Sequence, residues 1–389
     1  MDKIKIGITI HLRSDNESMF TNGIKMNAIF LANVLKKIGH DVILLDTGED
    51  VKKPFTNKVS WDIDEFPISK FKDSVMDQDL LITLGTVPSD QVLEKFKSKR
   101  KSNRVIAYQC GNSYVLDMER SIFKEGNLSP TNLIQMDQIW YIPQQHYQNK
   151  DYYYIRSKST KESDVKQVPF IWDPMFLDEN SSYKPGQLKK DEARFSIFEP
   201  NINVVKFCLP AILGVEEFYR NGGKYKNLNV FAAEKLFQSP FFKRILATLD
   251  ILGAGKIKLE KKYSVVDTLR VFTDVVLSHQ WENPLNYAYL DVMYLGYPLI
   301  HNADLIKDAA YYYPDFEIKE MANVIKHVVE NFEDNIEEYR VKNSKVLERY
   351  TSDNELLLDS YRKLIHDLMN DVDSNDKYDW KTNSLELWK

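Results

Sequence analysis

Short apolar runs alternate with longer helical or polar segments along most of the chain. Residues 3–10 (KIKIGITI) and 41–45 (DVILL) are rich in aliphatic and β-branched residues and predict two strands. Between them, apolar positions recur at helical spacing over residues 24–38, and Gly39 is of the residue type that commonly ends a helix. A strand, a helix and a strand in this order predict a βαβ unit, and therefore a parallel sheet.

The same pattern continues and then restarts in the second half of the chain. Residues 180–192 are polar and contain Pro185 and Gly186, so we interpret them as a linker. The domains predicted on either side cover residues 1–175 and 193–350. Further strands are predicted at 79–84, 104–109 and 138–142, and after the linker at 195–198, 228–232, 256–259, 273–277 and 298–300, with helices at 204–219 and 265–272.

The C-terminal part of the chain is charged and periodic. Residues 318–369 predict two or three helices, and we expect the polar tail from residue 370 onward to be loosely held. Two successive α/β halves predict two Rossmann-like, doubly wound parallel-sheet domains, with residues 351–389 forming a terminal helix and tail. Ligands of such sheets bind beyond the carboxyl ends of the strands, so the loops that follow strands are the places to look for a site.

Composition limits the function classes only moderately. The chain has 389 residues, of which 43% are hydrophobic and 28% charged, and this suits two globular cores. Its net charge of −5 gives no overall attraction to nucleic acid or anionic membrane. Cys110 and Cys208 lack metal-ligand spacing and fit a reducing compartment. With neither a signal peptide nor an apolar run long enough to cross a membrane, we expect a cytoplasmic protein. The oligomeric state stays open.

The most informative segment is residues 278–302, SHQWENPLNYAYLDVMYLGYPLIHN. It follows the predicted strand 273–277 and contains a predicted helix at 286–295, which Gly296 and Pro298 should end. The N–H groups of the loop would then collect at a helix N-terminus, and such a place binds anions. A plain βαβ unit with a well-capped helix is the alternative interpretation.

This segment resembles the donor-site signature of GT-B glycosyltransferases, in which two acidic residues separated by seven others precede A-M-x-x-G-x-P-V-I. Aligned on Gly296 and Pro298, Asp291 takes the second acidic position, which in that family holds the ribose hydroxyls. The first falls on Asn283, with Glu282 before it. This departure leaves open which of the two faces the sugar, and whether the outcome is inverting or retaining. The whole chain is also similar to poorly characterised bacterial and phage glycosyltransferase-like proteins that open with N-G-x-x-x-N-x-I-F-L-A.

The resemblance implies a GT-B fold, with two Rossmann-like domains facing a cleft and a C-terminal helix that crosses back to the first domain. It implies hexosyl or pentosyl transfer from a nucleotide-diphosphate sugar to a hydroxyl, without a metal or other cofactor. The acceptor would be a glycan or, as in T-even phage DNA glucosyltransferases of similar layout, a hydroxymethylated base in double-stranded DNA. A non-catalytic nucleotide-sugar- or glycan-binding protein and a sugar phosphorylase are the alternatives.

Donor binding is assigned to loops of the second domain. Lys206 lies just beyond that domain's first strand, where the family often places a phosphate-binding Arg or Lys, although a solvated lysine on a helix is the alternative. His279 could donate to a phosphate oxygen, and asparagines can bind sugar hydroxyls or cap the helix. The predicted donor-binding residues are Glu199, Asn201, Lys206, His279, Glu282, Asn283, Asn286 and Asp291.

Acceptor binding and the catalytic base are assigned to the first domain. An inverting enzyme needs a carboxylate or histidine base near the acceptor hydroxyl, and the loop 11–23 follows the first strand. The catalytic candidates are His11, Asp15 and Glu17, with Glu282 from the second domain, and the acceptor candidates are Arg13, Asn22, Gly23, Gln109 and Asn112. Charged loop residues facing water, and turn formation for the last two, are the alternatives.

Two charged features remain. A basic cluster predicts either a solvated helix face or a contact with a phosphate backbone. The pairs Asp62/Asp64 and Asp77/Asp79 have the D-x-D spacing of a metal site, but we interpret them as solvated acids and predict no metal site. The basic cluster consists of Lys95, Lys97, Lys99, Arg100, Lys101 and Arg104.

Overall fold

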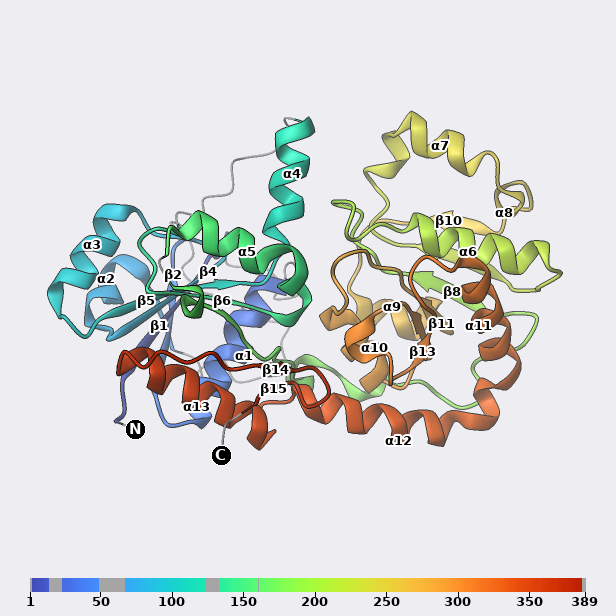
Figure 1. The fold of residues 1–389 in the computed structure, drawn as a ribbon. Helices are drawn as coiled ribbons and strands as arrows, with labels where there is room; N and C mark the ends of the chain where they lie inside the picture. Colours follow the sequence, from blue (N-terminus) through green and yellow to red (C-terminus); the bar gives the residue numbers. More distant parts are fainter. Residues whose placement is uncertain (1, 14–22, 49–66, 124–132, 160, 387–389) are drawn as a thin grey trace. The chain divides into compact units, whose positions relative to one another are not determined.

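The computed structural model shows two compact units in the chain. Unit 1 comprises Met1–Phe176 and Glu348–Lys389, and unit 2 comprises Leu177–Leu347 (Figure 1). The end of the chain therefore belongs to the body of unit 1, as the family resemblance implies. The structure describes residues 2–13, 23–48, 67–123, 133–159 and 161–386.

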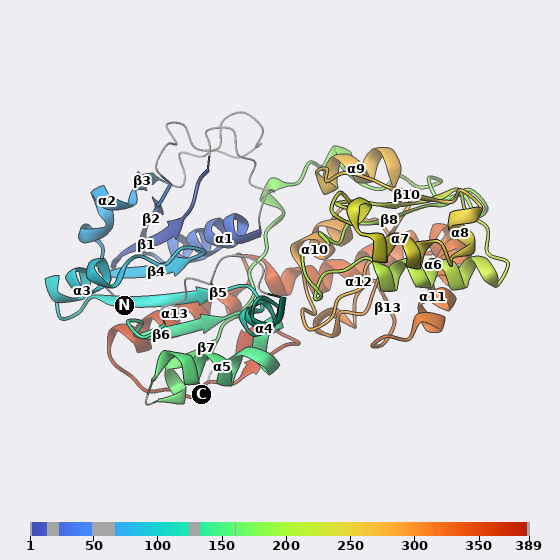
Figure 2. The ribbon, with the colours of Figure 1, turned by 90° about the horizontal axis from the view of Figure 1, so that it is seen from above.

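Unit 1 is built on a seven-stranded sheet in which every strand pair is parallel. The strand order is β3-β2-β1-β4-β5-β6-β7, so the order reverses between β1 and β4. Helices lie along the sheet (Figure 2). The strands are β1 (Lys5–Ile10), β2 (Asp41–Asp46), β3 (Ile68–Lys70), β4 (Leu80–Leu84), β5 (Arg104–Gln109), β6 (Gln138–Tyr141) and β7 (Val165–Gln167), and the helices are α1 (Gly23–Lys37), α2 (Phe71–Ser74), α3 (Asp90–Lys99), α4 (Ser113–Phe123) and α5 (His146–Ser157).

The apolar runs in the sequence become strands because both faces of this sheet are covered. Ile6 pairs with Val42 and Ile8 with Leu44, and all four side chains are buried. Continuous apolar strands of this kind are typical of parallel sheets buried on both sides. Gly39 follows the end of α1 and has φ +102°, a backbone conformation that other residues rarely adopt. The chain turns there from α1 into β2.

Unit 2 repeats the plan with a six-stranded parallel sheet of order β10-β9-β8-β11-β12-β13. Here the order reverses between β8 and β11. The strands are β8 (Arg194–Ile197), β9 (Asn227–Val230), β10 (Ile257–Leu259), β11 (Val275–Leu277), β12 (Leu299–His301) and β13 (Tyr311–Tyr312), and the helices are α6 (Leu209–Arg220), α7 (Pro240–Leu246), α8 (Asp250–Gly253), α9 (Val265–Phe272), α10 (Tyr287–Tyr294), α11 (Ile318–Asn331) and α12 (Ile336–Leu347).

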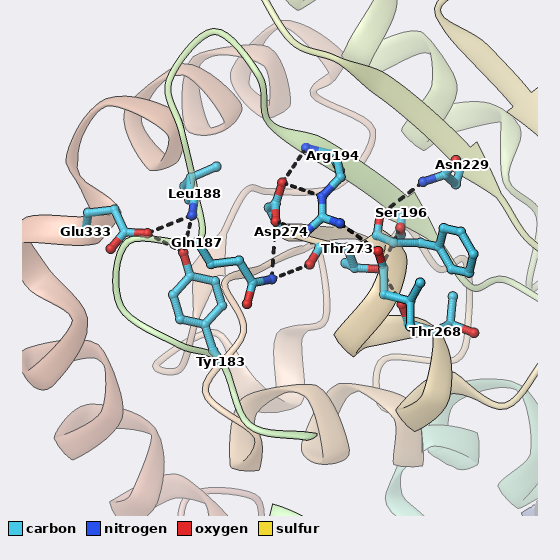
Figure 3. A network of polar contacts seen from close by, with 12 residues as sticks. Tyr183, Gln187, Leu188, Arg194, Ser196, Asn229, Thr268, Thr273, Asp274 and Glu333 are labelled. Atoms are coloured by element: carbon cyan, nitrogen blue, oxygen red, sulfur yellow. Dashed lines mark hydrogen bonds and ion pairs between the residues drawn. The ribbon is translucent and has the colours of Figure 1, made fainter. Parts of the chain in front are cut away.

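The amino ends of β8 and β11 are held together by a polar network (Figure 3). Arg194 and Asp274 form an ion pair, and the Gln187 side chain donates to the Thr273 carbonyl at 2.6 Å. Leu188 N–H donates to a Glu333 carboxylate oxygen at 2.8 Å. Part of the segment predicted as a polar linker is thus tied to the sheet of unit 2.

The C-terminal segment packs onto unit 1 through helix α13 (Glu355–Met369), where Tyr361 is fully buried and donates to the Pro169 carbonyl at 2.8 Å. The expectation of a loosely held tail is wrong for residues 371–386. Asn383 is fully buried and donates to two backbone carbonyls, and Leu385 is buried as well. These two anchors lie in an otherwise polar sequence, where hydropathy does not reveal them. They belong to the hairpin of β14 (Tyr378–Asp379) and β15 (Ser384–Leu385).

Candidate functional site

The candidate site lies in unit 2 where the carboxyl ends of β8 and β11 adjoin. Strand order reverses between these two strands, and open α/β sheets bind ligands at such a point. Glu199 follows β8, and Ser278 and His279 follow β11. The sequence places two predicted donor residues, Glu199 and His279, at this position, and the structure brings their strands side by side.

Glu199, Ser278 and Tyr289 form a hydrogen-bonded triangle, which we call the Glu199 cluster. Ser278 Oγ contacts Glu199 Oε1 and lies 2.6 Å from the Tyr289 hydroxyl, which is 3.3 Å from the same carboxylate oxygen. All three residues are buried, with Glu199 only 3% exposed. Burial raises the pKa of Glu199 to about 7, although the Ser278 hydrogen bond and the Lys206 charge oppose the shift. The cluster joins the segment after β8, the segment after β11 and helix α10. These segments meet where the strand order of the sheet reverses, which we call the switch point.

His279 is the second notable group. It is buried, its Nδ1 lies 2.8 Å from the Tyr313 hydroxyl, and its ring packs against Phe316. Burial lowers the pKa of His279 to about 4, so the ring is neutral near pH 7. The Tyr313 hydroxyl donates to the Ser278 carbonyl at 3.3 Å, so the proton of its contact with His279 comes from Nδ1. Nε2 of the neutral ring is then an acceptor, and it is buried with no hydrogen-bond partner among the described residues.

The loop between β11 and α10 is held by its own polar contacts. Gln280 N–H donates to Asn302 at 2.9 Å, Asn283 N–H to the Gln280 side chain at 2.6 Å, and Trp281 N–H to the Val205 carbonyl at 3.3 Å. Three amides that were expected to collect toward an anion are therefore used within the protein. The expectation of a backbone anion seat is wrong for these three, and the charge of a ligand would have to be met mainly by side chains.

The motif residues lie in or beside α10. Glu282 is partly exposed and has a left-handed backbone with φ +55°, and burial raises its pKa. Asn283 and Asp291 are each 6% exposed. Asn286 takes the N-cap position of α10, yet its side chain makes no capping hydrogen bond. The structure thus places the motif on one loop and one helix, with Asp291 in the second turn of that helix.

Lys206 lies in a loop and not in a helix. We predicted a helix at 204–219, but the observed helix, α6, starts only at Leu209. Asn201 explains the late start, since its backbone is left-handed at φ +52° and its side chain accepts from Cys208 N–H at 2.9 Å. Asn201 N–H also donates to the Lys206 carbonyl at 3.1 Å. Asn201 thereby shapes the loop that carries Lys206, which is partly buried and near enough to Glu199 to lower the pKa of that carboxyl.

The first-unit candidates are only partly described. Asp15, Glu17 and Asn22 lie outside the described residues. His11 follows β1, and its Nδ1 is 3.1 Å from the Thr47 hydroxyl. The other described candidates occupy the carboxyl edge of the same sheet or the start of a helix. Arg13 is exposed, Gly23 is the first residue of α1, Gln109 ends β5, and Asn112 accepts from Val115 N–H at 3.1 Å at the start of α4.

Sequence reasoning missed a second set of polar residues at this edge of unit 1. Asn149 is fully buried, accepts from Tyr114 N–H at 2.9 Å and donates to Asn112 at 3.0 Å. Gln145 is also fully buried and lies 3.5 Å from Asn149. The signal was available, because the polar run P-Q-Q-H directly follows a predicted strand. Ser278 and Tyr289 were likewise overlooked, although both lie inside the motif segment.

The basic cluster lies at the opposite, amino edge of the sheet of unit 1 and is largely ion-paired. Lys97 pairs with Asp137 at 2.7 Å and Arg104 with Asp371 at 2.8 Å. The acids of the described D-x-D pair serve the same purpose, because Asp79 pairs with Arg100 and Asp77 with Lys99. Asp62 and Asp64 lie outside the described residues. Within the described ranges, no group of three or more His, Cys, Asp or Glu side chains is arranged to hold a metal ion.

A cavity of 770 Å³ in unit 1 lies along the edge strand β7 and is separate from the candidate residues. Its charged side chains pair with one another, as in Lys150 with Glu162 and Lys161 with Asp373, each at 3.6 Å. Nothing in its lining favours a particular ligand. Among the described helices, none combines the length and apolar character needed to cross a lipid bilayer.

Two parallel sheets with reversing strand order are the architecture of GT-B proteins. Solved structures of glycosyltransferases with this fold resemble the chain over most of its length. A glycosyltransferase from Rickettsia africae matches with a TM-score of 0.57 at 11% identity, over 95% of this chain and 99% of that one. T4 alpha-glucosyltransferase, solved with UDP-glucose and DNA containing an abasic site, gives 0.59 at 15% identity, over 94% and 100%. The pneumococcal O-GlcNAc transferase, solved with UDP and GlcNAc, gives 0.56 at 10% identity, over 95% and 100%.

At these identities the likeness establishes the GT-B fold of this chain. The sequence belongs to the family described as a protein of unknown function, DUF2827, whose profile matches residues 6–365. No curated protein sequence matches the chain significantly.

Proposed function

We propose that this protein is a glycosyltransferase that moves a sugar from a nucleoside-diphosphate sugar to a hydroxyl acceptor. The observation that carries the proposal is His279, a buried neutral imidazole whose Nε2 has no partner among the described residues, at the switch point of the second sheet. Such a group needs a ligand donor, for example a sugar hydroxyl, since leaving a buried acceptor unsatisfied costs about 1–3 kcal/mol. T4 alpha-glucosyltransferase and the pneumococcal enzyme were solved with UDP-glucose and UDP, which supports this ligand class.

The proposed chemistry asks for charge stabilisation rather than a covalent step. As the sugar leaves, negative charge develops on the diphosphate, and the Lys206 ammonium would stabilise it. The His279 Nε2 would accept a hydrogen bond from a hydroxyl of the donor. Asp291 would hold the ribose hydroxyls, and Glu282 or Asn283 would face the sugar. His11 is the described first-unit candidate for a base on the acceptor hydroxyl. In this proposal neither a metal nor another cofactor takes part.

Of the two acceptor classes, a glycan hydroxyl is the better supported. The case for DNA rested partly on the basic cluster, and its ion pairs with Asp77, Asp79, Asp137 and Asp371 neutralise most of its charge. The cluster also lies at the amino edge of its sheet, away from the edge where ligands bind. T4 alpha-glucosyltransferase was solved with DNA, so a hydroxymethylated base is the second candidate acceptor.

The test is a thermal-unfolding screen of the protein against nucleotide sugars, followed by calorimetric titration and a donor-hydrolysis assay. A matched donor at about 100 times its dissociation constant should stabilise the protein by about 2.7 kcal/mol. Lys206→Ala should weaken donor binding about 10- to 100-fold, the worth of a hydrogen bond to a charged group, and His279→Ala about two- to tenfold, the worth of a neutral one. Lys235→Ala, at an exposed lysine of the same unit, is the matched control and should leave affinity unchanged.

The outcomes separate the alternatives. Donor binding without hydrolysis or transfer would favour a non-catalytic binding protein. Turnover that requires inorganic phosphate would favour a phosphorylase. If no nucleotide sugar shifts the unfolding temperature, the proposed function is wrong.

A further inference from the structure

The Glu199 cluster contains more hydrogen-bond contacts than its hydroxyl groups have protons. Three oxygen pairs are in contact, namely Ser278 with Glu199, Ser278 with Tyr289, and Tyr289 with Glu199. The two hydroxyls supply two protons between them. If Glu199 is ionised, one of the three contacts has no hydrogen. If Glu199 carries a proton, each group donates once and accepts once, and the triangle closes.

The surroundings of Glu199 also favour its neutral form. The titratable groups that interact with it electrostatically come from three further segments, and they are Lys206 before α6, Cys208 at the N-cap of α6, Tyr289 in α10 and Tyr313 after β13. Lys206 is the single cation in this set. Glu199 is buried, so the ionised carboxylate would depend on Lys206 for its charge compensation.

The same lysine is the proposed partner of the donor diphosphate. A bound diphosphate would draw on the Lys206 charge and would add negative charge beside the cluster. Both effects act against an ionised Glu199. Linkage then requires that a proton taken up at Glu199 and the donor reinforce each other.

We propose that Glu199 is a positioning residue that takes up a proton when the donor binds, so that Ser278 and Tyr289 hold the loop between β11 and α10 against the end of β8. This inference rests on the proposed function. The step is a protonation only, in which a solvent proton adds to a Glu199 carboxylate oxygen and no covalent bond of the donor changes. Its consequence is that donor affinity falls as pH rises above neutrality.

The experiment is calorimetric titration of the full chain with UDP-glucose, whose diphosphate does not titrate near neutral pH. At about pH 7.5, titrations in buffers of different ionisation enthalpy report how many protons are taken up per donor bound, and we expect a substantial fraction of one. Affinity should fall about three- to tenfold for each pH unit above about 7.5. Glu199→Gln retains a donor and an acceptor but cannot titrate, so its proton uptake and this pH dependence should both disappear.

Glu216→Gln is the matched control, because Glu216 is an equally buried carboxylate of unit 2 that accepts from Asp250 N–H and Ile251 N–H. It should retain the wild-type proton uptake. A merely structural Glu199 would leave the proton count of Glu199→Gln unchanged, and that result would overturn the inference.

The wild-type titration tests the idea even if a variant fails to fold. Binding of UDP-glucose without proton uptake would overturn this inference and leave the proposed function intact. Absence of UDP-glucose binding at every pH, together with no response to other nucleotide sugars, would overturn the proposed function and this inference with it.

Discussion

The Asp274 carboxylate accepts three hydrogen bonds from Arg194, from its backbone N–H at 2.8 Å, its Nε at 2.9 Å and its Nη2 at 2.5 Å (Figure 3). Asp274 immediately precedes β11, and Arg194 begins β8. The two strands whose carboxyl ends carry the candidate site are therefore joined at their amino ends. The Asp274 side chain is 3% exposed, so it depends on this partner for its charge compensation.

Asp274→Ala should destabilise unit 2 substantially without acting directly on the donor. Removing one partner of a buried ion pair leaves the other uncompensated and typically costs about 3–5 kcal/mol. We expect a loss of about 3 kcal/mol in urea unfolding, because Arg194 is partly exposed and can recover some solvation. Asp359→Ala, which breaks the exposed pair with Arg362, should cost under about 1 kcal/mol. Equal losses in the two variants would contradict this role for Asp274.

The buried histidines should make the fold sensitive to acid. Burial lowers the pKa values of His279 and His301 to about 4, and it also lowers those of His40 and His146. An unfolded chain binds these protons near pH 6.5, whereas the folded chain does not, so stability falls as pH drops from about 6.5 to 4. The first two histidines should each contribute up to about 3 kcal/mol to this loss. Urea midpoints measured across this range test the sign.

Glu199 should have the opposite effect on stability. Its pKa is raised to about 7, so the folded chain binds a proton that the unfolded chain releases, and stability is gained as pH falls from about 7 to 4.5. Glu199→Gln removes that gain. The variant should therefore lose up to about 3 kcal/mol more than the wild type over the same pH interval. Parallel curves for the two proteins would show that Glu199 does not titrate in this range.

Most of the architecture could be predicted from the sequence because buried parallel strands are short apolar runs. The two α/β halves, the motif helix and the three helices of residues 318–369 follow from such periodicity and from helix-ending residues. The two-residue strand β13 and the short strand β3 could not be predicted, since a run of two or three residues has no measurable period. The late start of α6 was hidden because Asn201 acts through its backbone conformation.

The site was predictable in position but not in its contacts. The residues after β8 and β11 could be named because ligands bind beyond strand ends, yet the Glu199 cluster joins residues 79 and 90 positions apart in sequence. The basic cluster shows the same limit, since Arg104 finds its partner Asp371 267 positions away. A local charge pattern cannot show that its charges are neutralised by distant acids.

Asn383 should prove a strong anchor of the C-terminal tail. Its side chain donates to the Phe170 carbonyl at 2.7 Å and the Arg349 carbonyl at 2.9 Å, and it accepts from Phe170 N–H at 2.9 Å. Asn383→Ala leaves two buried backbone groups and one partly buried group without their partner, so we expect a loss of about 2–4 kcal/mol in unit 1. Asn375→Ala is the control on the same tail, and limited proteolysis should cut only the Asn383 variant faster. Unchanged proteolysis of both would contradict the anchoring role.

The basic cluster should not contribute to DNA binding, because four of its six side chains form ion pairs with acids. Lys95 and Lys101 are exposed and take no part in these four ion pairs. The double variant Lys95→Glu/Lys101→Glu therefore reverses two charges without breaking the ion pairs of Lys97 or Arg104. If two phosphate contacts were lost, the slope of log affinity against log salt would fall by about 1.8. We expect no such change in fluorescence anisotropy with duplex DNA between about 50 and 200 mM salt. The control reverses two exposed lysines of α11, Lys319→Glu/Lys326→Glu, to correct for net charge, and a slope change confined to the first variant would make DNA the better supported acceptor.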